Sequence, residues 1–108
     1  MANAIRGVLV EELENSQRLL MKYQQAVAAL PKGSIREKKM GHQKFAYLVF
    51  RDGPRVKYEY KGKISAQEKA RYDEAKAMRA KYRGLIADLR KQIRFIERAL
   101  HERKRRPY

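Results

Sequence analysis

Apolar side chains recur at spacings of three and four residues over residues 1–30. The members of this repeat, one of which is polar, are Leu9, Leu13, Ser16, Leu20, Tyr23, Val27 and Leu30. Such a heptad seam predicts an amphipathic helix over residues 3–30. Asn3 is suited to cap its first turn, and Pro31 ends it because proline disfavours helical geometry at the residue before it.

The period changes from helical to two in the middle of the chain, over residues 34–63. Aromatic and branched residues dominate this segment, alternate with charged ones and predict an antiparallel sheet. Turns are marked by Gly41-His42 and by Asp52-Gly53-Pro54. An isolated hairpin is marginal in water, so the sheet is expected to lean on the helices. Strands are predicted at residues 45–50 and 56–60, and residues 34–40 could supply a third.

The strand at 45–50 is apolar on both of its faces. One alternating set is Phe45, Tyr47 and Val49, and the other is Ala46, Leu48 and Phe50. Only one of these faces can pack on the helices, so the opposite face is expected to present aromatic rings beside lysine and arginine. That combination suits a nucleic-acid platform, although a protein contact would use it equally well.

A second helix is predicted over residues 65–104. Ser65-Ala66-Gln67-Glu68 is a capping box, in which the serine and glutamate side chains satisfy each other's backbone amides. The apolar stripe that follows comprises Ala75, Met78, Tyr82, Leu85 or Ile86, Leu89, Ile93, Ile96 and Leu100. Gly84 interrupts the helix at a cost of roughly 1 kcal/mol relative to alanine. It either marks a close approach of the other helix or has no packing role.

These elements predict a mainly α fold and a single domain, residues 1–108. Two long antiparallel helices would form a coiled-coil-like helical hairpin with an inserted antiparallel β-sheet of two or three strands. At 1.5 Å per residue the helices span roughly 40 Å and 60 Å, so pairing outward from the sheet leaves the second one overhanging. The overhanging side chains, which are candidate oligomer contacts, are Phe95, Ile96 and Leu100. A two-fold dimer would bury them, unless the helix ends bend or fray and cover themselves.

The net charge of +15 is the largest departure from an average composition. Residues 1–30 contain three basic and three acidic residues, residues 31–64 contain ten and three, and residues 65–108 contain fourteen and six. The basic excess therefore begins at Lys32. Like charge destabilises a compact state, and a polyanion would relieve the repulsion.

The basic residues gather before and within the central strand, around the second hairpin, along one flank of the second helix, and in a basic tail at residues 103–108. Arg36 belongs to the first of these groups. The candidate nucleic-acid contacts, with one tyrosine among them, are Lys38, Lys39, Lys44, Arg51, Arg55, Lys57, Tyr58, Lys61, Lys63, Arg79, Arg83, Arg90, Arg94, Arg103, Lys104, Arg105 and Arg106.

The flank of the second helix is the most informative of these groups. Arg79 with Arg83, and Arg90 with Arg94, are like-charge pairs at i, i+4, which destabilise a helix by a few tenths of a kcal/mol each. Phosphates along the flank would convert this repulsion into counterion release. The alternative is a solvated basic face of a protein that is merely soluble.

Several classes of function find no support in the residues. The chain has no cysteine, and no metal site or cofactor is expected. His42 and His101 stand alone and are expected to be surface histidines, so no catalytic residue is assigned. The longest apolar runs are too short to cross a bilayer, and acidic residues interrupt the N-terminal segment before a signal sequence could develop. A cytoplasmic protein with no membrane partner and no small-molecule substrate is expected.

The order of motifs resembles a family of small uncharacterised prokaryotic proteins with a helix–sheet–helix layout. The segments that carry the resemblance are Leu-Pro-Lys-Gly-Ser-Ile (30–35), Lys-Phe-Ala-Tyr-Leu-Val-Phe-Arg (44–51) and Lys-Tyr-Glu-Tyr-Lys-Gly-Lys (57–63). Some members carry a cysteine knuckle between the first two strands. Residues 38–44 contain none, so no metal role carries over, and the family supplies no activity to transfer.

The central segment also resembles the three-stranded sheets at the N-termini of some tyrosine recombinases and transposases, which place a sheet against DNA. This resemblance implies DNA contacts at Lys44, Arg51, Arg55, Lys57 and Tyr58. No recombinase catalytic domain follows in the chain. The leading hypothesis is a non-enzymatic nucleic-acid-binding protein, and the alternative is a coiled-coil module for protein–protein interaction or assembly.

Overall fold

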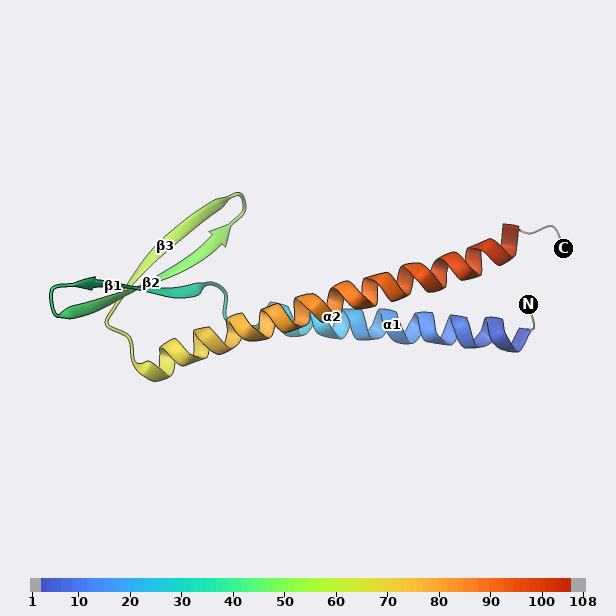
Figure 1. Cartoon of the computed structure of the whole chain (residues 1–108), viewed down its shortest axis with the longest axis horizontal. Helices are drawn as coiled ribbons and strands as arrows, with labels where there is room; N and C mark the ends of the chain where they lie inside the picture. The colour runs from blue at the N-terminus through green and yellow to red at the C-terminus, as the bar shows by residue number, and fades with distance from the viewer. Residues whose placement is uncertain (1–2, 106–108) are drawn as a thin grey trace. The chain divides into compact units, whose positions relative to one another are not determined.

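Two long helices flank a three-stranded sheet in the sequence, as Figure 1 shows for the computed structural model of the chain. The structure describes the backbone of residues 3–105 and the side chains of residues 4–101. The elements are α1 (Asn3–Ala29), β1 (Ser34–Met40), β2 (Gln43–Asp52), β3 (Arg55–Gly62) and α2 (Ala66–Arg105). The predicted mainly α fold with an inserted antiparallel sheet is confirmed, and so is the third strand.

The heptad seam of α1 forms its least exposed side. Every member from Leu9 to Leu30 is buried or half-buried, and the polar member Ser16 is the most buried, at 4% exposure. The Ser16 hydroxyl accepts a hydrogen bond of 2.8 Å from Nε2 of Gln92. The buried Ser16 hydroxyl therefore has a hydrogen-bond partner, which explains how a serine is accommodated in an apolar seam. Seven residues further along the seam, the ring of Tyr23 lies 5.4 Å from that of Tyr82 between centroids.

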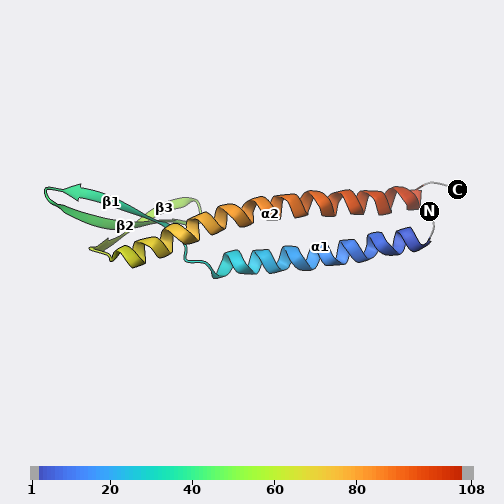
Figure 2. The same cartoon turned by 60° about the horizontal axis from the view of Figure 1, so that its bottom comes forward.

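Helix α2 begins where the capping box predicted. The amide of Glu68 donates a 3.0 Å hydrogen bond to Oγ of Ser65, and the amide of Lys69 donates to the Ser65 carbonyl at 3.1 Å. These two bonds satisfy amide groups that a helix N-terminus otherwise leaves unpaired. Figure 2 shows α2 as one unbroken helix that follows this cap.

The sheet is antiparallel with the strand order β1-β2-β3, so β2 is its central strand. Ala46 and Leu48 of β2 are 2% and 8% exposed, whereas β3 is exposed over most of its length. A register irregularity lies between Ala46 and Tyr47. The predicted alternation is therefore confirmed, because the side chains of the Ala46 and Leu48 set are the ones that are buried.

The chain divides into two compact units that share α2. One unit combines α1 up to Ala28 with α2 from Lys81 onward, and the other runs from Ala29 to Ala80 and contains the sheet. The first part of α2 therefore belongs with the sheet, and α1 shares its unit with the later part.

This division corrects the predicted overhang. Ile96 is only 5% exposed and Leu100 is half-buried, whereas Phe95 is 68% exposed. The overhang was predicted by pairing the helices from the sheet outward, whereas α2 before Lys81 belongs to the unit that contains the sheet. Of the three candidate oligomer contacts, Phe95 is the one whose side chain is mostly accessible.

Gly84 has no close neighbour at the place where a side chain would project. A Cβ built on it has nothing within 4 Å. The close approach considered from the sequence is therefore not found.

No helix in the described part of the chain is long and apolar enough to cross a membrane.

Substitution Gly84→Ala is expected to raise the free energy of unfolding by roughly 0.5–1 kcal/mol, because glycine loses more backbone entropy in a helix than alanine. Urea unfolding followed by circular dichroism measures the change. The matched control is Ala87→Gly on the exposed side of the same helix, for which the opposite sign is expected. A destabilising Gly84→Ala would mean that another chain segment packs on this position.

Candidate nucleic-acid interface

The link between α1 and β1 is held by Arg79 of α2. Its guanidinium donates hydrogen bonds to the carbonyl of Pro31 and, at 2.9 Å, to the carbonyl of Gly33. Gly33 has a positive φ of 92°, and a Cβ there would lie 2.8 Å from both Cδ1 of Leu48 and the Val49 carbonyl oxygen. The structure thus gives Arg79 a structural role, which differs from the phosphate contact expected from its flank.

One face of the sheet gathers aromatic and basic side chains, and we call it the aromatic face. Register pairs Arg36 with Tyr47 and Lys38 with Phe45, while Tyr47 and Val49 pair with Tyr60 and Tyr58. Because directly paired residues share a face, the three strands present one continuous set. Its aromatic, basic and aliphatic members are Arg36, Lys38, Phe45, Tyr47, Val49, Arg51, Val56, Tyr58 and Tyr60.

Three of the four aromatic rings of this face lie close together. The Tyr60 centroid lies 5.3 Å from that of Tyr47 and 6.3 Å from that of Phe45, with interplanar angles of 57° and 38°. Tyr58 remains 69% exposed and Tyr60 58%. A shallow hollow on the face is lined by Arg36, Glu37, Lys38, Tyr47 and Tyr58. The face is thus an open platform with a basic edge along β1.

The acidic residues of the three strands all occupy the opposite face. They are Glu37, Asp52 and Glu59. Each forms an ion pair: Asp52 with Lys57 at 2.7 Å, Glu59 with Lys61 at 3.4 Å, and Glu37 with Lys69 of α2. Although Glu37 also lines the shallow hollow of the aromatic face, its carboxylate is directed to Lys69. The basic side chains of the aromatic face therefore have no acidic residue on their own face.

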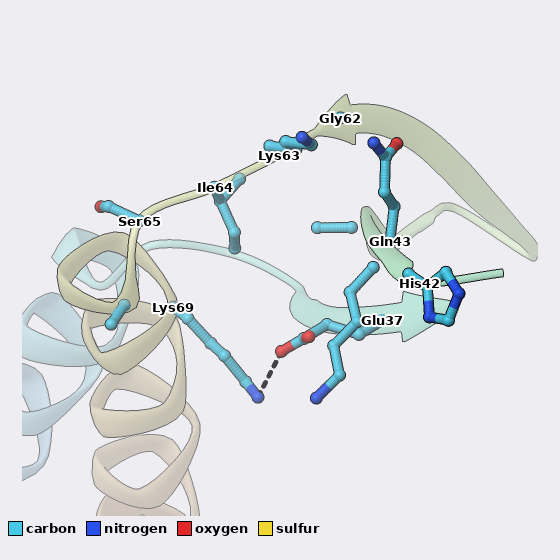
Figure 3. Close-up of a pocket in the computed structure, with 11 residues that line it drawn as sticks. Glu37, His42, Gln43, Gly62, Lys63, Ile64, Ser65 and Lys69 are labelled. Carbon is cyan, nitrogen blue, oxygen red and sulfur yellow. Dashed lines mark ion pairs between the residues drawn. The ribbon is translucent and has the colours of Figure 1, made fainter. Parts of the chain in front are cut away.

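Figure 3 shows a second hollow, which lies on the opposite face of the sheet beside the start of α2. Here Lys69 reaches toward Glu37. Its lining includes His42, which is exposed in the β1–β2 turn as predicted, and Ser65 at the helix start. The Glu37 carboxylate and the Lys69 ammonium in this second hollow are paired with each other. We therefore interpret the ion pair as a contact that holds the start of α2 to the sheet.

The Glu37–Lys69 pair shifts the titration of both groups. The hydrogen bond from Lys69 is the main cause that lowers the pKa of Glu37. Desolvation opposes it, and the positive charges of Lys69 and Lys44 add smaller lowering effects. The hydrogen bond to Glu37 is likewise the main cause that raises the pKa of Lys69, with Asp73 contributing.

These shifts predict where the ion pair stabilises the fold. A lowered carboxyl pKa contributes stability above its ordinary value of 4.5, and the contribution is lost as pH falls through the folded-state pKa. A raised lysine pKa contributes stability below 10.5, and the contribution is lost as pH rises through the folded-state value. Glu37→Gln should therefore destabilise the protein at neutral pH and converge with the parent in acid.

Urea unfolding at neutral and strongly acidic pH measures this convergence. The control is Glu74→Gln, which removes an exposed carboxylate elsewhere on α2. A Glu37→Gln variant whose stability deficit is the same at both pH values would contradict the role given to the pair.

The sequence-predicted candidates separate into several groups. Lys38, Arg51 and Tyr58 lie on the aromatic face, and register places Lys39, Lys44, Arg55 and Lys57 on the opposite side. Lys61 is half-buried in its ion pair, and Lys63 follows β3.

The remaining candidates lie in the other unit. Arg83, Arg90 and Arg94 are exposed on α2. The side chains of Arg103, Lys104 and Arg105, and the whole of Arg106, lie outside the described residues.

Six members of the aromatic face were not among the candidates. They are Arg36, Phe45, Tyr47, Val49, Val56 and Tyr60. The alternation along each strand was a usable signal, but choosing the face for β1 and β3 requires the register between strands. Placing Arg36 opposite Tyr47, and Tyr47 opposite Tyr60, depends on that register.

Comparison of the chain with known protein-family models, curated proteins and solved structures found no match. The resemblances drawn from the sequence motifs thus stay predictions, and the case for function depends on the geometry above.

Proposed function

We propose that this protein binds nucleic acid without catalysing a reaction, mainly through contacts to phosphate. The observation that carries the proposal is the separation of charge across the sheet. Arg36, Lys38 and Arg51 share the aromatic face with four aromatic rings, and the strands' acidic residues are all on the opposite face. A face that is basic and aromatic but lacks acids suits a ligand with anionic and aromatic parts.

The unit that combines α1 with the later part of α2, which we call the helix unit, adds a second basic surface. Arg83, Arg90 and Arg94 are exposed on α2, and Arg90 and Arg94 are four residues apart. Such neighbours repel each other in the free protein, and phosphate would replace the repulsion with attraction. The net charge of +15 acts in the same direction over longer distances.

The double variant Arg36→Gln/Lys38→Gln is expected to weaken binding and to flatten its salt dependence. Each lost phosphate contact reduces the slope of log K against log salt by roughly 0.7 for a single strand and roughly 0.9 for duplex DNA. Fluorescence anisotropy over a salt series measures the slope with labelled oligonucleotides of mixed sequence.

The control for total charge is Arg18→Gln/Lys22→Gln, which removes two exposed positive charges from α1. Its slope should remain close to that of the parent. Equal slopes for the two double variants would show that the aromatic face makes no specific phosphate contact. Absence of binding at low salt would reject the proposed function.

We further infer that α1 and α2 pair as an antiparallel helical hairpin. Tyr23 contacts Tyr82, whereas Ser16, seven residues earlier in α1, contacts Gln92, ten residues later in α2. Contacts that advance in opposite directions along two helices support antiparallel pairing. The heptad spacing of the α1 seam supports coiled-coil-like packing.

Assembly through α1 is the second candidate function, and exposed apolar side chains favour it. Ile5 and Val8 are 55% and 58% exposed, and Leu19 is 36% exposed. Spacings of three and eleven residues place them along one side of the helix. Since the segment that forms α1 carries no net charge, two copies of this basic protein would meet there with the least repulsion.

Sedimentation equilibrium of the parent and of Val8→Lys tests this candidate. A dimer that the substitution dissociates would support it. A protein that stays monomeric at all accessible concentrations would reject it.

A further inference from the structure

We propose that the aromatic face binds single-stranded nucleic acid, with unpaired bases stacking on Tyr58 and Tyr60. The inference deepens the proposed function and rests on it, because it names the form of nucleic acid that the face takes. It also gives the tyrosines a direct role in contacting the ligand.

The exposure of the two rings makes them available for stacking. Tyr58 is the most exposed large apolar side chain in the described part of the chain, at 69%, and Tyr60 is 58% exposed. Both rings lie on one face of β3 and leave most of their surface accessible to a ligand. Exposed aromatic surface of this kind is typical of binding sites.

Contacts with neighbouring rings restrict the orientation of Tyr60. It packs on Tyr47 and Phe45 at centroid separations of 5.3 Å and 6.3 Å, in tilted geometry, while more than half of its surface stays accessible. A ring that is already restricted loses less conformational entropy when a base stacks on it. Tyr60 is thus a preorganised part of the platform.

The spacing of the side chains matches a ligand with repeated aromatic and anionic groups. Tyr58 and Tyr60 are two residues apart on β3, and so project from the same face roughly 7 Å apart. Arg36 and Lys38 lie on β1, two strand spacings away, or roughly 10 Å. A strand that stacks its bases on β3 would therefore place its backbone within reach of the long basic side chains of β1.

Unpaired bases fit this face better than a duplex does. In a duplex the base faces are stacked on each other, and proteins read base edges chiefly with arginine, asparagine and glutamine. The face carries Arg36, Arg51 and Gln43 as residues of this kind, but it also carries four aromatic rings, which a duplex would leave without a stacking partner. In a single strand the bases can splay out and stack on aromatic side chains.

The test measures the affinity of the full-length protein for single-stranded RNA, single-stranded DNA and duplex DNA of equal length and mixed sequence. Tyr58→Leu and Tyr60→Leu remove the ring and keep an apolar side chain, whereas Tyr58→Phe and Tyr60→Phe keep the ring. Val56→Ala is the matched control, since Val56 is 49% exposed on the same strand and face.

We expect each leucine variant to bind single strands roughly 5- to 150-fold more weakly, which corresponds to the loss of one stacked base. The phenylalanine variants and Val56→Ala should stay close to the parent, and duplex affinity should change little. Thermal unfolding of each variant verifies that the sheet remains folded.

The outcomes separate the inference from the proposed function. Equal affinity for single strands and duplex, or leucine variants that bind single strands as well as the phenylalanine variants, would overturn the inference and leave the proposed function standing. Failure to bind any nucleic acid at low salt would overturn both.

Discussion

Replacement of Ile96 by alanine is expected to lower the free energy of unfolding by about 2–5 kcal/mol. Ile96 is 5% exposed and belongs to the small set of buried apolar side chains, of which Ile93 is also in the helix unit. Truncating it removes apolar contacts and leaves a cavity that two helices have few other side chains to fill. Urea unfolding followed by the circular dichroism of the helices measures the change.

Phe95 supplies the matched control, because it is adjacent in sequence and 68% exposed. Phe95→Ala is expected to change the free energy of unfolding by no more than about 0.5 kcal/mol, as is usual for surface substitutions. Similar losses for the two variants would contradict the side of α2 that the structure buries. A loss for Phe95→Ala that grows with protein concentration would instead support the predicted oligomer contact.

Replacement of Gly33 by alanine is expected to lower the free energy of unfolding by about 2–5 kcal/mol. The positive φ of 92° costs a residue with a side chain roughly 1–2 kcal/mol. The collision of the new Cβ with Leu48 and with the Val49 carbonyl oxygen adds about 1–3 kcal/mol of overpacking. Leu48 cannot move away easily, because it is one of the buried side chains of the sheet. Thermal unfolding should show a fall of about 4–8 °C per kcal/mol lost.

Gly53→Ala separates the two causes. Gly53 has a similar φ of 62° in the β2–β3 turn, but a Cβ there has nothing within 4 Å. It should lose the conformational part alone, about 1–2 kcal/mol. Equal losses at the two glycines would show that the link between α1 and β1 is looser than the structure describes.

The local features of the chain were predictable because short-range sequence patterns determine them. The heptad seam of α1, the Ser65 cap of α2 and the division of β2 into two faces all follow from the spacing of apolar and polar residues. The predicted helix bounds differ from the observed ones by one residue at the C-terminus of α1 and by one residue at each end of α2. Backbone geometry and hydrogen bonding within a few residues decide these features.

The roles of individual basic residues needed the tertiary structure. Arg79 and Arg83 look equivalent in the sequence, yet Arg79 bonds two backbone carbonyls in the link after α1, while Arg83 is exposed. The difference depends on residues about fifty positions earlier in the chain. No local pattern around Arg79 contains that information.

The sequence by itself determined the helices, the strands, the basic charge and the existence of an aromatic face on the central strand. Only the tertiary structure decided which residues of β1 and β3 join that face, because strand register is set by pairing between distant segments. It also decided that Ile96 is buried and Phe95 exposed on the part of α2 that shares a unit with α1. Helical periodicity shows that a helix has an apolar side, but what covers each turn of that side depends on long-range packing.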